Sequence, residues 1–310
     1  MSERTMSDRP KRARRCQLSV PGSSEKMMAK ATGLEVDHIF LDLEDAVAPA
    51  EKPSARSKII EALNSLDFGN SVRCVRINDI ETPWAYKDII EVVTGAGENL
   101  DTIMIPKVKY AHEVKWVDIL INQIEQDIGL KHRIGIELLI EEVEGIQNVD
   151  EIAVATPRLE AMVFGMGDYS ASQGVDVKEA MSSGESIYPG DIWHYQRQRV
   201  VIACRAAGID AVDGPFGNFR DPESYEREAT RAMVLGCVGK WAIHPAQVEV
   251  AQRVFSPTQE EVDRARKIVQ AYDAAVARGE GAAQVDDAMI DAASVRLVQN
   301  TLDKANLYGL

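Results

Sequence analysis

The sequence predicts a (β/α)₈ TIM barrel followed by a C-terminal helical appendage. Eight short apolar runs alternate with longer segments that have helical period and helical composition. Apolar strands that are each followed by a helix are typical of a parallel sheet covered by helices, and eight such units over about 250 residues match a closed barrel. A doubly wound open sheet is the alternative, and it is disfavoured because no strand is followed by a full GxGxxG loop.

The expected strands come at regular intervals along residues 15–255, which we expect to form the barrel. They are CQLSV (16–20), HIFLDL (38–43), SVRCVRI (71–77), TIMIPK (102–107), IGIELLI (134–140), LEAMVFG (159–165), AVDGP (211–215) and GKWAIH (239–244). The longest irregular stretch, residues 168–191, follows the sixth strand. In a barrel, a long loop at that place usually shapes access of substrate to the site.

Both ends of the chain are expected to lie outside the barrel. Residues 1–14 are rich in Arg and Lys, and a flexible, solvated arm is the ordinary interpretation of such a terminus. Residues 256–310 begin with SPTQEEVDRARKIVQAYDAAVARGEG, which predicts a capped, charged amphipathic helix. GEGAAQ is typical of a flexible joint, and DDAMIDAASVRLVQNTL is expected to begin a final helix.

Composition excludes several classes of partner. The net charge of −14 argues against nucleic acid or an anionic membrane, because both need a cationic face. No run approaches the roughly 18 apolar residues of a membrane span. The four cysteines form no CxxC pair, which indicates reduced, mostly buried thiols in a cytoplasmic protein. The five histidines lack metal-ligand spacing, so any metal should be a hard cation held by carboxylates.

Ionisable residues stand at the end of nearly every expected strand from the second onward. Because a barrel enzyme builds its site from the carboxyl ends of the strands, we expect these residues to share one rim. For any single residue, a solvated loop charge is the alternative. In chain order they are Asp42, Glu44, Asp45, Arg76, Lys107, Glu141, Asp168, Asp213 and His244.

Glu141 and Asp168 are the candidate metal ligands. They follow adjacent strands, and two carboxylates with waters and an oxygen-rich substrate suit Mg²⁺. The alternative is an exposed acid at Glu141 and a helix N-cap at Asp168. Arg76 lies inside an apolar strand, which costs energy unless it pairs with an anion. That anion could be Glu44 or Asp45, or a substrate carboxylate or enolate.

Asp291, in the segment MIDAAS, is a candidate acid or base in the C-terminal extension. Its neighbours are small and apolar, and burial there would raise its pKa and suit it to proton transfer. An N-cap of the last helix is the structural alternative.

Ten segments together resemble the citrate lyase β-subunit and malyl-CoA lyase family, within the HpcH/HpaI aldolase superfamily of coenzyme A ester lyases. They are RRCQLSVPGSSEK, IFLDLEDAVAPAEKPSAR, VRIN, IMIPKV, IELLIEEVEGI, FGMGDYSAS, VDGPFGNF, GKWAIHPAQ, FSPT and MIDAAS. They occur in this order from residue 14 to the start of the last helix. The combination of LDLEDAVAP with GKWAIHP is highly specific, and VDGPFGNF and DIWHYQ favour the malyl-CoA lyase branch.

The resemblance implies a homotrimer or homohexamer whose C-terminal segment packs over the active site of a neighbouring subunit. It implies Mg²⁺, with Mn²⁺ as the alternative, held by Glu141 and Asp168. It also implies that Arg76 contacts the thioester or its enolate and that Asp291 is an acid/base donated across the interface.

Two further groups of residues receive roles through the resemblance. Asp42, Glu44 and Asp45 are expected to orient Arg76 and Lys52 and to brace the waters of the metal. The residues expected to bind coenzyme A or the substrate are Ser19, Pro21, Gly22, Lys30, Lys52, Arg76, Gly167, Asp168, Ile243 and His244.

The implied activity is that of a carbon–carbon lyase acting on a β-hydroxyacyl-CoA, with a coenzyme A thioester and a small 2-oxo acid as partners. The expected reactions are cleavage of L-malyl-CoA to acetyl-CoA and glyoxylate, or the reverse Claisen-type condensation, and cleavage of β-methylmalyl-CoA to propionyl-CoA and glyoxylate. Ser19 and Ser24 replace an aromatic and a basic residue of close malyl-CoA lyases, which leaves the acyl preference open. The alternatives are a malyl-CoA thioesterase, a citramalyl-CoA lyase, and a non-catalytic acyl-carrier-binding subunit of a citrate lyase-type complex.

Overall fold

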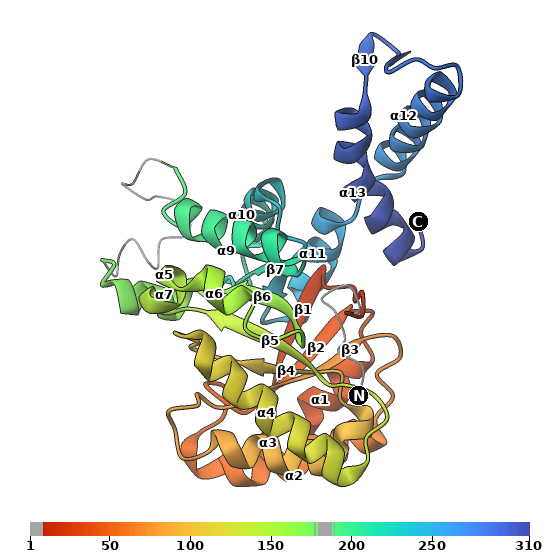
Figure 1. The fold of residues 1–310 in the computed structure, drawn as a ribbon. Helices are drawn as coiled ribbons and strands as arrows, with labels where there is room; N and C mark the ends of the chain where they lie inside the picture. Colours follow the sequence, from red (N-terminus) through yellow and green to blue (C-terminus); the bar gives the residue numbers. More distant parts are fainter. Residues whose placement is uncertain (1–8, 177, 179–187, 189) are drawn as a thin grey trace.

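A closed barrel of eight parallel strands, surrounded by helices, forms the body of the computed structural model (Figure 1). The structure describes residues 9–176, 178, 188 and 190–310. The strands are β1 (Cys16–Pro21), β2 (His38–Asp42), β3 (Val72–Arg76), β4 (Thr102–Ile105), β5 (Gly135–Ile140), β6 (Leu159–Phe164), β7 (Asp210–Asp213) and β8 (Gly239–Ala242). Each strand pairs with the next, and β1 also pairs with β8, which closes the barrel. The TIM-barrel fold expected from the sequence is therefore confirmed.

Helices follow the strands and form the outer layer, as the alternating sequence pattern predicts. The described helices around the barrel are α1 (Glu25–Thr32), α2 (Lys52–Ser65), α3 (Ala85–Ala96), α4 (Ala111–Ile128), α5 (Val143–Gln147), α6 (Val149–Ala153), α7 (Met166–Gln173), α9 (His194–Ala207), α10 (Pro222–Leu235) and α11 (Val248–Phe255). Some begin as sequence rules require: Asp221 caps α10 by accepting from the Ser224 amide at 3.0 Å, and Pro222 fills its first turn. In the chain that the structure describes, no helix has the length and apolar character needed to cross a membrane.

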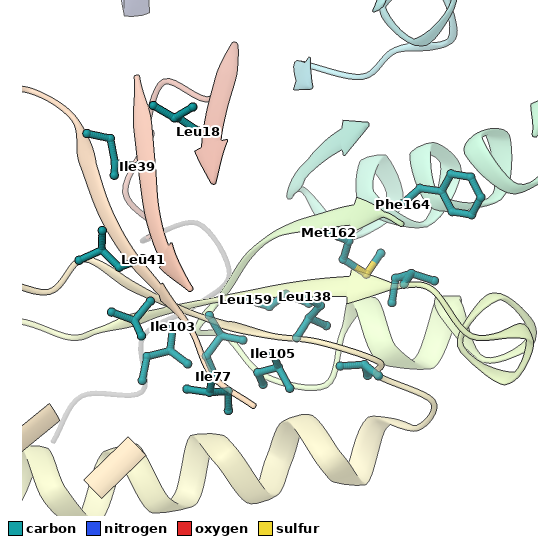
Figure 2. Close-up of a cluster of buried hydrophobic side chains, with 14 of the residues drawn as sticks. Leu18, Ile39, Leu41, Ile77, Ile103, Ile105, Leu138, Leu159, Met162 and Phe164 are labelled. Carbon is teal, nitrogen blue, oxygen red and sulfur yellow. The ribbon is translucent and has the colours of Figure 1, made fainter. Parts of the chain in front are cut away.

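Apolar side chains fill two separate spaces, because successive strand residues point to opposite faces. The larger cluster lies between the strands and the helices, where Figure 2 shows Ile77 and Ile105 facing a helix of the outer layer. The smaller cluster fills the middle of the barrel itself. Its members are Phe40, Cys74, Met104, Leu139, Val163, Val212, Val238 and Trp241. We call this smaller cluster the apolar plug. Polar and charged side chains lie beyond it at both ends of the barrel, so the two ends have different electrostatic environments.

The basic N-terminal arm docks against the amino-terminal end of the barrel. Arg14 is 1% exposed, and its guanidinium pairs with three carboxylates. These belong to Glu137 (3.1 Å), Glu160 (2.6 Å) and Asp210 (3.1 Å). Gly239 permits the close passage of the arm, since a Cβ there would lie 1.7 Å from the Arg14 carbonyl oxygen.

The neighbouring arginines of the arm are also held in place. Arg12 pairs with Glu160 at 3.0 Å and with Asp101 at 2.9 Å. Arg9 donates from Nη1 to the carbonyl oxygen of Ala207 at 2.8 Å. The expectation of a flexible, solvated arm is therefore wrong for residues 9–14. Its cations compensate carboxylates that the strands place at this end of the barrel.

The C-terminal extension is a helical hairpin that projects from the barrel (Figure 1). It consists of α12 (Gln259–Ala277), β9 (Ala283–Val285), β10 (Ala288–Ile290) and α13 (Ala292–Tyr308). Thr258 and Glu261 form the capping box that the sequence predicts for α12. The expected flexible joint is corrected: part of GEGAAQ pairs as β9 with β10, and the last helix begins only at Ala292.

The far end of α13 returns to the barrel. The Tyr308 ring lies 4.2 Å from the guanidinium carbon of Arg15, and Ala305 is buried. A small apolar cluster of its own stabilises the tip of the hairpin; it contains Ile268, Val285 and Ile290. The extension is thus anchored at its base and carries its tip away from the barrel.

Candidate active site at the carboxyl end of the barrel

Arg76, the last residue of β3, is the centre of an ion-pair cluster inside the carboxyl end of the barrel. Its Nε and Nη2 donate to the two carboxylate oxygens of Asp42, each at 2.7 Å, and its Nη1 lies 2.8 Å from Glu44 Oε2. The guanidinium carbon of Arg76 lies 5.9 Å from the ring centroid of Phe40 and 5.5 Å from that of Trp241. The expected pairing with Glu44 is present, whereas Asp42 takes the place expected for Asp45.

Asp42 is the compensated carboxylate of this cluster. It also accepts hydrogen bonds from the backbone amides of Glu44 (2.9 Å) and Ala46 (3.0 Å). Burial alone would raise the pKa of Asp42, but Arg76 and the two amides outweigh it and hold this pKa below its usual value. Asp42 is therefore an anion that fixes the position of Arg76.

Lys107 links the acidic residues of the rim. Its ammonium contacts Glu44 and lies 3.4 Å from Asp45, and its backbone amide donates to Glu141 Oε1 at 3.0 Å. Lys107 has a φ of 53°, a left-handed conformation that is rare outside glycine, and the amide reaches Glu141 from this turn. Asp45 is thus on the rim but pairs with Lys107 and not with Arg76.

Glu141 is a buried carboxylate with little compensation. It is 2% exposed and accepts a hydrogen bond from the backbone amide of Lys107. Burial, and then repulsion from Glu44 and Asp168, raise the pKa of Glu141 well above its usual value. Gly165 leaves room for this side chain, because a Cβ there would lie 2.5 Å from Glu141 Oε2.

Asp168 and Gly167 lie in the first turn of α7, directly after β6. Asp168 is half-buried and close enough to Glu141 for the two carboxylates to repel each other. Two such groups, with room for waters and substrate oxygens, fit Mg²⁺, which seldom receives a complete protein cage. The described part of the chain holds no group of three or more His, Cys, Asp or Glu side chains that could hold a metal. The donor set therefore fits a hard divalent cation.

The ammonium group of Lys52 forms its hydrogen bonds within the protein. It is 6% exposed and donates to the carbonyl oxygens of Leu43 (2.9 Å) and Glu44 (2.8 Å) and to the Asn78 side chain. All three ammonium protons are used. The expected direct contact of Lys52 with coenzyme A is therefore corrected to a supporting one, since Lys52 ties the loop after β2 to the end of β3.

The other residues expected to bind coenzyme A lie on the first and last strand ends and on α1. Gly22 is buried, and its amide donates to the Asp42 carbonyl oxygen at 2.9 Å. Ser19 and Pro21 are half-buried at the end of β1, and the alternation of the strand places them on its barrel side with Gln17. Lys30 has an exposed side chain in the last turn of α1, farther along the outer layer.

Ile243 and His244 follow β8 at the same end of the barrel. Ile243 is 41% exposed, and the imidazole of His244 stacks on the Phe219 ring with centroids 4.6 Å apart. His244 Nδ1 accepts from the Ala246 amide at 3.2 Å. The sequence patterns did not single out Phe219; an exposed aromatic in the loop after the seventh strand was the available signal.

Two expectations for this end of the barrel need correction. Asp213 does not join the rim: it points outward and pairs with Arg197 (2.8 Å) and Lys240 (2.6 Å) between the barrel and the helices. The stretch 168–191 is not irregular throughout, because α7 continues to Gln173. Residues 177, 179–187 and 189 of that stretch lie outside the described part.

Asp291 lies between β10 and α13, in the hairpin that projects from the barrel (Figure 1). It is exposed and caps α13, accepting from the Ser294 amide at 2.9 Å. These hydrogen bonds lower the pKa of Asp291, so the expected rise of its pKa is wrong for the single chain. Its N-cap role is confirmed, and among the described residues the hydrogen bonds of Asp291 are made with Ser294 and not with the rim.

The closed parallel barrel, with buried carboxylates and an arginine at its carboxyl rim, defines an enzyme of the TIM-barrel class. The HpcH/HpaI aldolase/citrate lyase family profile matches residues 15–245. The chain is 43% identical to an L-malyl-CoA/β-methylmalyl-CoA lyase of Cereibacter sphaeroides over 315 residues, covering 99% of both chains. This protein therefore belongs to the HpcH/HpaI aldolase/citrate lyase family.

Two further relatives extend the comparison. A malyl-CoA/β-methylmalyl-CoA/citramalyl-CoA lyase of Chloroflexus aurantiacus is 34% identical, covering 96% of this chain and 89% of the relative. The crystal structure of CitE from Mycobacterium tuberculosis, in complex with magnesium, acetoacetate and coenzyme A, superposes with a TM-score of 0.73 at 28% identity. That match covers 94% of this chain and 97% of the neighbour.

Proposed function

We propose that this chain is a Mg²⁺-dependent carbon–carbon lyase that cleaves L-malyl-CoA to acetyl-CoA and glyoxylate, and β-methylmalyl-CoA to propionyl-CoA and glyoxylate. The observation that carries the proposal is the 43% identity, over the full length, to enzymes named for these two substrates. The geometry of the rim supports it, because Glu141 is a buried carboxylate left with little compensation. A cytoplasmic location accords with four buried, unpaired cysteines.

Glu141 and Asp168 would hold the metal, leaving coordination positions for the hydroxyl and carboxylate oxygens of the substrate. When bound, Mg²⁺ supplies Lewis acidity that favours loss of the substrate hydroxyl proton and neutralises charge on the keto acid. Magnesium is supported by the CitE neighbour, which was crystallised with it. Lys107 keeps Glu141 in place through its backbone amide.

Arg76 would stabilise the negative charge that develops on the thioester oxygen as the carbon–carbon bond breaks. Two of its five N–H groups donate to the Asp42 carboxylate, and Glu44 Oε2 is an ion-pair partner of Nη1 without a hydrogen bond, which leaves three N–H groups for the substrate. Because Asp42 already fixes the guanidinium, no reorganisation is needed when charge appears. Preorganised donors of this kind contribute about 3–4 kcal/mol to a transition state.

Asp291 would protonate the enolate carbon of acetyl-CoA, acting on the rim of a neighbouring copy. It lies on the hairpin that projects from its own barrel, and this hairpin exposes two large apolar side chains, Met289 at 78% and Leu297 at 76%. Burial of these side chains against a second copy would also desolvate Asp291 and raise its pKa towards a value useful for a general acid. We therefore propose a homo-oligomer, trimeric or hexameric, as the active form.

Coenzyme A would lie across the rim near Ile243 and the stacked pair of His244 and Phe219. The stacked rings offer a flat aromatic surface that suits a nucleotide base. Ser19, Pro21, Gly22 and Lys30 line the path from β1 to α1 that the rest of the cofactor would follow.

An assay with Mg²⁺ and three thioesters tests the reaction. The purified protein should release glyoxylate and an acyl-CoA from malyl-CoA and β-methylmalyl-CoA. Release of pyruvate from citramalyl-CoA would make it a lyase of broader range, like the Chloroflexus relative. Free malate and coenzyme A without glyoxylate would identify a thioesterase and overturn the proposal.

Subunit mixing tests the role given to Asp291. Asp291→Asn should lower kcat by about 10²–10⁴-fold, the usual contribution of a general acid. Glu141→Ala should also be inactive, through loss of the metal. If Asp291 acts across the interface, co-expressed or exchanged mixtures of the two variants should regain activity, because some sites then combine an intact rim with an intact Asp291. Mixtures without regained activity would contradict donation between subunits.

A further inference from the structure

A cavity of about 450 Å³ lies at the amino-terminal end of the barrel, between the docked arm and α13. It is on the opposite side of the apolar barrel plug from the rim, so it is not part of the proposed active site. Three carboxylates line it together with six cationic side chains, in a chain whose net charge is −14. The cations are Arg9, Lys11, Arg12, Arg14, Arg205 and Lys304.

The carboxylates of the cavity do not account for all of these cations. Glu160 and Asp210 pair with Arg12 and Arg14, and those four groups compensate one another. The third carboxylate, Asp303, is exposed on α13. The remaining cations therefore face the cavity with an excess of positive charge.

Two of the remaining cations have donors without an acceptor. Arg9 Nη2 is a buried nitrogen with no hydrogen-bond partner, although its Nη1 bonds to the end of α9. Within the described residues, Lys304 Nζ makes no hydrogen bond or ion pair. Burial, and then the nearby Arg205, lower the pKa of Lys304, although Asp210 and Glu261 act in the opposite direction.

Buried donors without partners and desolvated like charges both cost free energy. Three structural elements meet here to produce that cost: the arm through Arg9, α9 through Arg205 and α13 through Lys304. A bound anion would give Arg9 and Lys304 acceptors and offset the charge of Arg205, which is exposed and donates to the Gly236 carbonyl oxygen at 3.0 Å. We propose that this cavity is a binding site for a compact organic polyanion that carries two or more carboxylate or phosphate groups, with Arg9, Arg205 and Lys304 as its ligands.

The chemistry of the ligand follows from the donors. Arg9 offers its Nη2 group for one anionic oxygen, because its Nε and Nη1 already donate to backbone carbonyl oxygens of Pro157, Ala207 and Gly208. Lys304 and Arg205 offer separate charges from other walls, so a monoanion would engage only part of the site. A cavity of about 450 Å³ holds a small metabolite but not a protein segment with side chains.

Calorimetric titration of the full-length protein with citrate and with pyrophosphate tests the site and separates carboxylate from phosphate ligands. Free Mg²⁺ is held constant, because both probes chelate it. At least one probe should bind once per chain, and acetate should bind far more weakly.

Lys304→Gln and Arg9→Gln should each weaken binding by about ten-fold or more, as expected for a lost charge-assisted bond, and Lys304→Arg should retain it. Lys115→Gln, an equal charge change on the exposed face of α4, is the matched control.

A second measurement protects the test against misfolded variants. Without ligand, Lys304→Gln should melt at the same temperature as the wild type or higher, because it removes a desolvated charge near Arg205. A lower melting temperature would show that Lys304 already has a stabilising partner and would overturn the proposal. So would absence of saturable binding, equal weakening by Lys115→Gln, or a change of oligomeric mass in Lys304→Gln, which would make the cavity a contact between copies.

Discussion

Glu137 and Glu141 lie four residues apart along β5 and its carboxyl end, and both point into the barrel, yet their environments are opposite. Glu137 is fully buried and has Arg14 (3.1 Å), Gln17 (2.8 Å) and His38 (3.0 Å) around its two oxygens. Glu141 is equally buried and has one backbone amide and two repelling carboxylates. The pKa of Glu137 lies below its usual value and that of Glu141 well above it.

The contrast assigns different roles to the two glutamates: Glu137 contributes to stability, and Glu141 is left available for function. Burial alone would raise the pKa of both side chains, so the difference comes from what else the fold supplies. At the amino-terminal end the carboxylate is satisfied by Arg14 of the arm, the Gln17 amide of β1 and the His38 imidazole of β2. At the carboxyl end the corresponding cation, Arg76, is taken by Asp42, and Glu141 is left to bind something that is not part of the chain.

The largest effect should follow from removing the satisfied glutamate. Glu137→Ala leaves Arg14 and His38 buried without their shared anion, and breaking such a buried network costs about 3–5 kcal/mol. Thermal and urea unfolding of wild type and variant measure this loss. The surviving folded fraction should keep its kcat, because the apolar plug separates Glu137 from the rim.

Glu137→Gln is the matched control, since it keeps the volume and the hydrogen bonds of one oxygen and removes the charge. It should lose less stability than Glu137→Ala. A variant as stable as the wild type would show that the network at this end contributes nothing and would remove the basis of the contrast.

Metal removal should have the next largest effect, and it should act through the other glutamate. A ligand present at a hundred times its dissociation constant stabilises the folded state by about 2.7 kcal/mol, so the wild type should melt at a lower temperature in EDTA than in Mg²⁺. Glu141→Gln should abolish this shift. In EDTA the same variant should be as stable as the wild type or more so, because it replaces a poorly compensated buried charge by a neutral amide.

The matched control for metal removal is Glu44→Gln, which alters a neighbouring acid that the salt-bridge cluster already uses. It should retain the Mg²⁺ shift at a reduced size. A full Mg²⁺ shift in Glu141→Gln would contradict the assignment of Glu141 as a metal ligand.

The sequence could predict the barrel and the acidic rim because both depend on local patterns: apolar runs that alternate with helices, and ionisable residues after strands. It could not predict how cations are shared among carboxylates. Arg14 pairs with residues 123 to 196 positions away, and no spacing in the arm indicates this. For the same reason Asp213, which follows a strand like Glu141 does, turned out to be neutralised outside the barrel.

Short elements at the tip of the extension were also beyond the sequence pattern. β9 and β10 have three residues each, too few for an alternation to be recognised, and Asp286 in the turn between them adopts a φ of 52°. The same limit applies to Asp291: its sequence neighbours are small and apolar, but they lie on an exposed tip, where burial requires another copy.

The smallest effect expected is a difference in pH dependence between the two ends of the barrel, at most about 1.4 kcal/mol per pH unit for one proton. The pKa of Glu137 is lowered in the folded state, so its contribution is present above its unfolded pKa of about 4.3 and is lost as the pH falls below that value. The pKa of Glu141 is raised, so in metal-free protein its ionisation opposes folding at neutral pH, and this penalty disappears as the pH falls towards 4.3. The stability advantage of wild type over Glu137→Gln should therefore shrink between pH 5 and 3. The advantage of Glu141→Gln over wild type, in EDTA, should shrink earlier, while the pH is still above about 4.3. Melting curves of the three proteins across this range measure both windows, and a common window for the two glutamates would show that their surroundings are not as different as their hydrogen bonds indicate.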